Sequence, residues 1–192
     1  MTERAGSWRV VVPIVLVLAV AAVGVRWAVG DSGDDSPEPL AVTGEGPRFA
    51  TTDELIAASD VAVIGSVVRV DEGRAITDPD NPAAGIRTQL ATIEVGDVLL
   101  GESNGPLIVE QEFELLDGTP IVVNGVSPLA VGDVGAMFVV RGDSEEFPYV
   151  AFVNEQGWVP IIDGAVAPID PGDPLWSPFV GSAPSALADA MR

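Results

Sequence analysis

An uncharged apolar run near the amino terminus constrains this chain more than any other feature. The run extends from Val10 to Val25, and a tryptophan and an arginine stand at each end of it: Trp8, Arg9, Arg26 and Trp27. The run and these flanks make 20 residues. As a helix they would rise about 30 Å, the thickness of the hydrocarbon core of a bilayer. Tryptophan favours the headgroup level, and arginine can reach it. We therefore predict a transmembrane helix over residues 10–29, with the four flanking side chains as membrane-interface anchors.

The charges on either side of this run predict its orientation. Arg4 and Arg9 precede it, whereas acids follow it closely, from Asp31 onward. By the positive-inside rule, residues 1–9 lie in the cytoplasm and the rest of this single-pass chain lies outside the cell membrane. The alternative is secretion after signal-peptide cleavage, but the A-x-A-like sites lie within the apolar run rather than after it. An uncleaved signal anchor is therefore favoured, with the lipid bilayer as a partner of the chain.

The chain is strongly acidic. It has 29 Asp and Glu residues against nine basic residues, all of them arginine, and its net charge is −20. A nucleic-acid interface must neutralise phosphates with basic side chains, so this composition argues against nucleic acid as a partner. Cysteine and histidine are both absent from the sequence. Their absence removes disulfides, zinc sites built from Cys and His, and the Ser-His-Asp and Cys-His catalytic systems.

Composition divides the rest of the chain into three parts. Residues 30–47 are rich in Gly, Pro, Ser and acids, which predicts a flexible acidic linker. Residues 48–168 are long enough for one extracytoplasmic domain with its own core. Residues 169–192 are predicted to be a tail with a short helix near its end. At the start of the domain, Thr51 has the residue type and position of an N-cap, which predicts a short helix after it.

Most of the domain is predicted to be β-strand. Runs rich in β-branched residues occur over 60–70, 87–100 and 134–141, and turn residues separate them. Gly65 and Gly96 interrupt the first two runs and are candidate β-bulges, which a strongly curved sheet needs. The predicted fold class is therefore mainly β, a small antiparallel, OB-like barrel preceded by a short helix. The expected shared core of its sheet consists of Ile64, Val68, Ile93, Val95, Phe138 and Val140.

Three stretches carry a resemblance to known proteins. They are SDVAVIGSVVRV at 59–70, LATIEVGDVLLG at 90–101 and LAVGDVGAMFVVR at 129–141. Together they resemble uncharacterised exported bacterial proteins and, more distantly, the OB-type barrel of netrin-like domains and tissue metalloprotease inhibitors. The inhibitors of that group act through an amino-terminal cysteine that reaches a zinc ion, and this chain has no cysteine. The resemblance therefore implies a barrel fold rather than that inhibitory activity.

Two groups of residues form the candidate binding surface. Alternation along a strand would place Glu110, Glu112 and Glu114 on one face. Such a row could hold calcium or share a raised pKa, but it is more typical of a solvated strand face. Trp158 and Trp176 could form an aromatic platform for a ligand, although Trp158 begins an apolar run and is more typical of a core residue. No catalytic, metal or cofactor site is predicted.

These features predict a non-catalytic, membrane-anchored binding or interaction module, with a protein as one candidate partner. Two alternatives remain open. A carboxylate-dependent envelope hydrolase would need two acids that face one cleft. An accessory subunit of a membrane complex would pack through its span, where small residues allow helices to approach closely: Ala19, Ala21, Ala22 and Gly24.

Overall fold

The structure, a computed structural model, describes residues 38–44, 46–79, 81–142 and 149–191. The predicted transmembrane helix and its four flanking anchors lie outside these residues. Within the described ranges, no helix is both long enough and apolar enough to cross a membrane.

The described chain is mainly β, as predicted, with two short α-helices and two 3-10 turns. Its elements follow one another in this order: β1 (Leu40–Val42), α1 (Thr52–Ala58), β2 (Val61–Asp78), β3 (Asn81–Leu100), β4 (Leu107–Leu115), β5 (Ile121–Val123), β6 (Val134–Arg141), β7 (Val150–Phe152), η1 (Glu155–Gly157), β8 (Trp158–Ile162), β9 (Ala165–Val166), η2 (Ser177–Phe179) and α2 (Pro184–Ala190).

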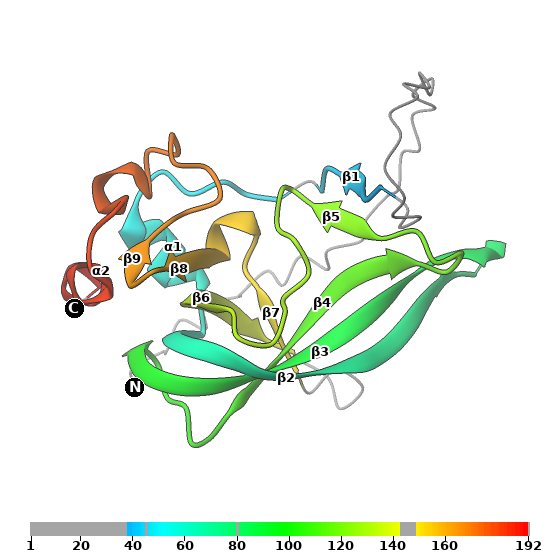
Figure 1. The fold of residues 1–192 in the computed structure, drawn as a ribbon, viewed down its shortest axis with the longest axis horizontal. Coiled ribbons are helices and arrows are strands. Elements are labelled where there is room, and N and C mark those ends of the chain that lie inside the picture. Colours follow the sequence, from blue (N-terminus) through cyan, green and yellow to red (C-terminus); the bar gives the residue numbers. More distant parts are fainter. Residues whose placement is uncertain (1–37, 45, 80, 143–148, 192) are drawn as a thin grey trace, which may run out of the picture.

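Five of these strands form a ring (Figure 1). Their order is β2–β3–β4–β7–β6, and β6 pairs with β2 again. Neighbours in the ring are antiparallel, except that β4 and β7 pair in parallel. Strand β8 pairs with β6, and β9 lies on the other side of β8. Because the sheet closes on itself, few strand edges of the ring are left with unpaired backbone groups.

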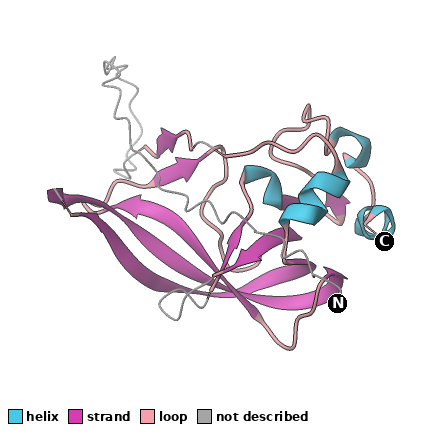
Figure 2. Ribbon diagram, turned by 180° about the vertical axis from the view of Figure 1, so that it is seen from behind, coloured by secondary structure: helices cyan, strands magenta, loops and turns pink. Residues whose placement is uncertain are grey.

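The two longest strands continue beyond the ring. Strands β2 and β3 have 18 and 20 residues, but β2 pairs with β6 only from Val61 to Ser66. The distal halves of β2 and β3 run on with β4 as a three-stranded ribbon. Figures 1 and 2 show this ribbon on one side of the molecule and the helices on the opposite side.

The fold extends beyond the predicted domain limits at both ends. Strand β1 pairs in parallel with β5, so the chain from Leu40 onward belongs to the fold. At the other end, η2 and α2 pack on the sheet, and Met191 is still buried. The helix at the start of the domain is confirmed: Thr51 is the N-cap of α1, and its hydroxyl accepts a hydrogen bond from the Glu54 amide at 3.3 Å.

Bulges bend the long β2–β3 pair. Ile64 pairs with Asp97 and Gly65 with Val95, so Gly96 is an extra residue in β3. The predicted bulge at Gly96 is therefore confirmed, and Gly65 lies directly beside it in β2. An extra residue makes a strand bend and twist more strongly, which a closing sheet requires.

A further bulge has no glycine to mark it. Val67 pairs with Ile93 and Arg69 pairs with Thr92, which leaves Val68 as an extra residue in β2. Val67 follows the alternation of Val61 and Val63 and is buried with them in one core, whereas Val68 points to the opposite face and is 46% exposed. The prediction that Val68 belongs to the core is therefore wrong.

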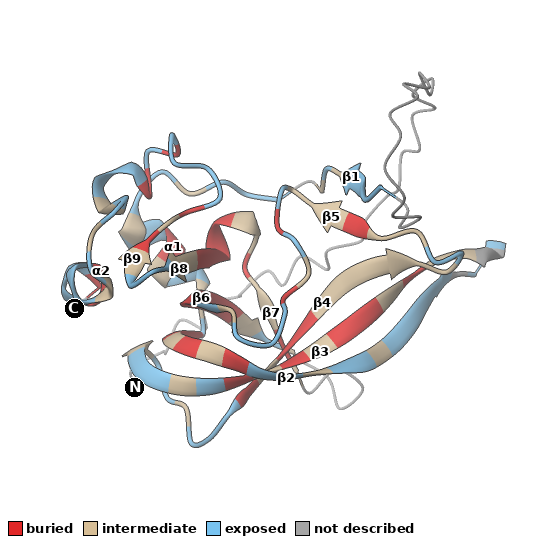
Figure 3. Cartoon of the chain, viewed as in Figure 1, coloured by how far each residue is buried: buried red, intermediate tan, exposed pale blue. Residues whose placement is uncertain are grey.

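The buried apolar residues form two cores, one on each face of the ring wall. The inner core takes residues from all five ring strands and includes Ile93, with Val95 packed against it. The outer core includes Phe138, with Ile64 and Val140 packed against it, and lies against α1, η2 and α2. The prediction of one shared core is therefore wrong, because β2 and β6 are covered on both faces. Figure 3 shows burial where the strands form the ring and exposure along distal β2.

The burial of Ile93 and the exposure of Val68 predict a contrast between two substitutions. Ile93→Ala removes a fully buried side chain from the inner core, so the free energy of unfolding should fall by about 2–5 kcal/mol. Val68→Ala should change it by no more than about 0.5 kcal/mol, because Val68 faces solvent. Urea denaturation of both variants is the measurement. Equal losses would mean that Val68 does not face solvent as described.

Candidate functional site

The acidic face of β4 is not solvated along its whole length. The Glu110 side chain is only 3% exposed, and its Oε1 accepts hydrogen bonds from Arg74 Nε at 3.0 Å and from Thr88 Oγ1 at 2.7 Å. Arg74 reaches Glu110 because β2 has an extra residue opposite Thr88, and a bulge of this kind redirects a side chain. The interpretation of this row as a solvated face is therefore wrong for Glu110, a buried carboxylate paired with the partly exposed Arg74.

The next two acids of the row have different surroundings. Glu112 is partly buried, and this burial raises the pKa of its carboxyl above the usual value. The nearby charge of Glu110 raises the pKa of Glu112 further. Glu114 lies 3.6 Å from the Arg87 guanidinium. Over the described ranges, no group of three or more acids is placed to hold a metal ion, so the calcium interpretation of this row gains no support.

The raised pKa of Glu112 predicts a pH-dependent effect of Glu112→Gln. The folded state binds the proton more tightly than the unfolded state does. The contribution of Glu112 to the free energy of unfolding is therefore greatest at a pH below the usual pKa of a glutamate. It is lost as the pH rises through the raised pKa of the folded state. Glu112→Gln should accordingly stabilise the protein near pH 7 and lose this advantage below about pH 4. Denaturation curves at the two pH values measure it.

The control for this experiment is Glu94→Gln, since Glu94 is exposed on β3. Its effect on the free energy of unfolding should be small at pH 7. A destabilising effect of Glu112→Gln at pH 7 would contradict the assignment of burial as the cause.

Trp158 and Trp176 do not offer an open platform. They are 6% and 2% exposed, as expected of core residues. Trp158 lies in the inner core with its ring centroid 6.0 Å from that of Phe152. Trp176 lies in the outer core, 5.6 Å from Phe138 and 6.3 Å from Phe179 between ring centroids. Because neighbouring side chains cover these rings, stacking on a ligand is not available to them.

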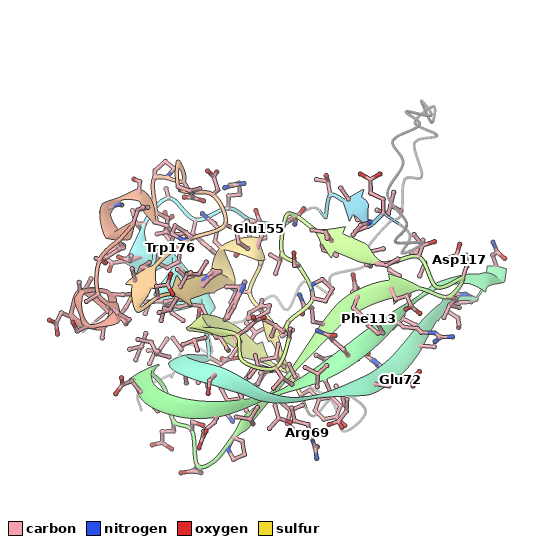
Figure 4. All side chains as sticks on the ribbon, viewed as in Figure 1. Arg69, Glu72, Phe113, Asp117, Glu155 and Trp176 are labelled. Atoms are coloured by element: carbon pink, nitrogen blue, oxygen red, sulfur yellow. The ribbon has the colours of Figure 1, made fainter. Side chains whose placement is uncertain are left out.

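The five predicted site residues are therefore not brought together. The acids lie on β4 and the tryptophans lie in the two cores. In Figure 4 Trp176 is at the helical end of the molecule, whereas Phe113 of β4 is on the ribbon. The three acids of β4 line neither of the concave surfaces described below. Trp158 lines both of these surfaces, and Trp176 lines the first one with it.

The first concave surface is a cavity of about 570 Å³ between the chain at 41–48, the turn after β5, η1 and the tail. Arg48 lines it and bridges two carboxylates. Its Nη2 lies 2.8 Å from Asp173 Oδ2, and its Nη1 lies 3.3 Å from Glu155 Oε1. Glu155, Asp170 and Asp173 thus all line one cavity, so acids share a concave surface as the hydrolase alternative requires. However, the guanidinium stands between Glu155 and Asp173, where a water molecule or a scissile bond would have to lie, and Asp170 Oδ1 accepts a hydrogen bond from the Gly172 amide at 2.9 Å.

A buried hydrogen-bond network holds this arrangement in place. The Gln156 amide donates to Asp173 Oδ2 at 2.8 Å and to the Phe49 carbonyl at 3.1 Å, and its oxygen accepts from the Phe49 amide at 2.7 Å. The other Asp173 oxygen accepts from the Leu175 amide at 2.9 Å. These contacts fasten the start of the domain to its tail. The cavity therefore contains a structural clamp.

The second concave surface is an open groove of about 650 Å³ between the loop before β6 and the β8–β9 hairpin. It is lined by residues 127–128, 132–134 and 160–164, together with Trp158. The Trp158 ring packs directly on the backbone of Gly135, where a Cβ atom would overlap it. This glycine allows the indole to reach the groove from β8.

Large apolar side chains surround this groove and face solvent. Val134 and Ile162 line it and are 38% and 59% exposed, and Val131, next to its lining, is 65% exposed. Single exposed apolar residues are common, but several around one concave surface are typical of an interaction site.

Two tight turns hold these side chains in position. Two hydrogen bonds between Ala130 and Asp133 close the turn at 130–133. The Asp133 amide donates to the Ala130 carbonyl at 3.0 Å, and Asp133 Oδ2 accepts from the Ala130 amide at 2.8 Å. In the β8–β9 turn, Asp163 and Gly164 both have positive φ, +52° and +76°. The groove is therefore preformed, which lowers the entropic cost of binding.

The sequence identified Trp158 and Trp176, which both line the cavity, but predicted neither the cavity nor the groove. A usable signal for the groove was present, because Val131-Gly-Asp places a large apolar residue within a turn and Ile162-Asp-Gly places one directly before a turn. The cavity gave no such signal, since its clamp joins Arg48 to a residue 125 positions away.

No protein-family model matches the chain, and no curated protein is significantly similar to it. The resemblance to netrin-like barrels therefore stays a prediction, and the function has to be argued from the surfaces of the molecule.

Proposed function

We propose that this protein is a membrane-anchored, extracytoplasmic binding module that docks a partner protein in the groove beside β8. The observation that carries the proposal is the set of exposed apolar side chains around a preformed concave surface: Val131, Val134 and Ile162. The location rests on the apolar run bounded by Trp8 and Trp27 and on the arginines that precede it.

We further propose that the ring is an OB-type barrel. An OB barrel is a five-stranded Greek-key barrel that binds its ligands with strand faces and loops. The order β2–β3–β4–β7–β6 with return to β2, and the parallel pairing of β4 with β7, support this class. The three stretches that resemble netrin-like barrels contribute to β2, β3 and β6, so the resemblance and the topology point the same way.

The proposal of a docking module is better supported than that of a hydrolase. Of the three acids that share a cavity, Glu155 and Asp173 bind Arg48, and Asp170 accepts a hydrogen bond from the Gly172 amide. Glu110 binds Arg74 and Thr88. Each of these acids thus makes a contact within the fold. The accessory-subunit alternative is compatible with docking, since a subunit of a membrane complex would also need an exposed contact surface.

Single cysteines test location and docking together, because the natural chain has no thiol. Ser127→Cys places a thiol at the groove without removing an apolar wall, since Ser127 lines the groove and is exposed. Ile76→Cys places one on the distal ribbon, where Ile76 is 41% exposed. The measurement is the rate of labelling by a membrane-impermeant maleimide, in spheroplasts and in purified full-length protein. We expect both variants to react in spheroplasts. Relative to Ile76→Cys, Ser127→Cys should react several-fold more slowly in spheroplasts than after purification, because a partner covers the groove.

Two results would overturn parts of this proposal separately. If neither thiol reacts until the spheroplasts are lysed, the domain is not outside the membrane. If the ratio of the two rates is the same in spheroplasts and in pure protein, the groove is unoccupied and the docking function is wrong.

A further inference from the structure

We infer that the groove accepts an apolar side chain flanked by basic residues, presented by a segment of a partner protein. This inference rests on the proposed docking function and adds the chemistry of the partner. Its basis is the combination of exposed apolar walls with a rim that carries charges of one sign.

The charges of the groove are acidic. Asp133 and Asp163 belong to its lining, and no arginine lines it. Asp133 uses one carboxylate oxygen to close its own turn, whereas Asp163 is exposed at the tip of the β8–β9 turn. The chain as a whole carries a net charge of −20. A partner surface must therefore be basic to approach without repulsion, and the same field accelerates its encounter with the groove.

The walls of the groove include apolar side chains. Val134 and Ile162 expose aliphatic groups to the groove, and Pro160 adds an apolar ring to the lining. Aliphatic walls of this kind bind a leucine-like or isoleucine-like group through burial of apolar surface. The basic residues of the partner would lie beside it, within reach of Asp163.

Pairing of a partner strand with β9 is less suitable here. The Val166 amide donates to the Ser182 carbonyl at 2.9 Å, and the Val166 carbonyl accepts from the Gly181 amide at 2.8 Å. The outer edge of β9 is thus occupied by the chain's own residues 181–182. Recognition at this groove therefore depends on side chains rather than on backbone hydrogen bonds to β9. The side chains of the partner segment thus determine whether it binds.

The test uses purified full-length Ser127→Cys protein in detergent, a neutral maleimide and three short acetylated peptides. The first peptide has a leucine between an arginine and a lysine, the second has glutamates in place of both basic residues, and the third has serine in place of the leucine. With a Kd of about 0.5 mM, a peptide at about 1 mM should slow labelling about threefold. We expect this protection from the first peptide only, and none for Ile76→Cys.

Two further conditions separate charge from packing. Asp163→Asn removes the charge but keeps a residue that tolerates positive φ, so the turn is retained and protection by the first peptide should weaken. Raising the salt concentration to about 0.5 M should weaken it as well, since screening acts on exposed charges. The matched control is Asp97→Asn on β3, an exposed acid outside the groove, which should leave the protection unchanged.

The outcomes distinguish this inference from the docking function. Equal protection by the acidic peptide, or no protection by any peptide, would overturn the chemistry inferred for the partner. Either result would leave slow labelling of Ser127→Cys in spheroplasts, and thus the docking function, standing. If labelling of the groove cysteine were not slowed in spheroplasts, the docking function on which the inference rests would itself be wrong.

Discussion

The pairing of β2 with β6 is the contact on which the rest of this structure depends, because it turns an open sheet into a ring. Gly65 and Gly135 lie opposite each other in this pairing. A Cβ atom on Gly65 would lie 2.6 Å from the Glu94 carbonyl oxygen, and one on Gly135 would overlap the Trp158 ring. Both positions therefore require the absence of a side chain, since neither the backbone of β3 nor a buried indole can move away easily.

Closure of the ring also determines where the two cores and the groove lie. Strand β6 is buried on both faces, so Met137 and Val139 face the inner core while Ala136 and Phe138 face the outer one. The outer core is completed by α1 and the tail, which the Arg48–Asp173 clamp holds together. Trp158 crosses from β8 to pack on Gly135 and contributes to the inner core and to the lining of the groove. The groove is thus a consequence of how the ring closes.

Much of the secondary structure could be predicted from the sequence, because its signals are local. The N-cap at Thr51, the strands over 60–70 and 87–100 and the bulge at Gly96 all depend on residue types within a few positions of one another. The continuation of β2 to Asp78 and the start of β3 at Asn81 were not predicted. The bulge at Val68 could not be predicted, since no glycine marks it and only the register with β3 reveals it. The ion pair of Arg74 with Glu110 joins residues 36 positions apart, and it too depends on the register between β2 and β3. Because such long-range contacts decide burial, the sequence identified the candidate acids as a row but did not show that they are buried to different degrees. The groove was missed because three separate segments line it.

The most direct test of this account is the free energy of unfolding of Gly135→Ala in the full-length chain, compared with Gly105→Ala. Nothing lies within 4 Å of a Cβ atom on Gly105, whose φ is not positive. Because an added methyl group at Gly135 must displace Trp158 from the point of ring closure, we expect a loss of about 1–3 kcal/mol. Gly105→Ala should change the stability by no more than about 0.5 kcal/mol. If Gly135→Ala were as harmless as Gly105→Ala, the ring would not close through this contact, and the groove would not be built as described.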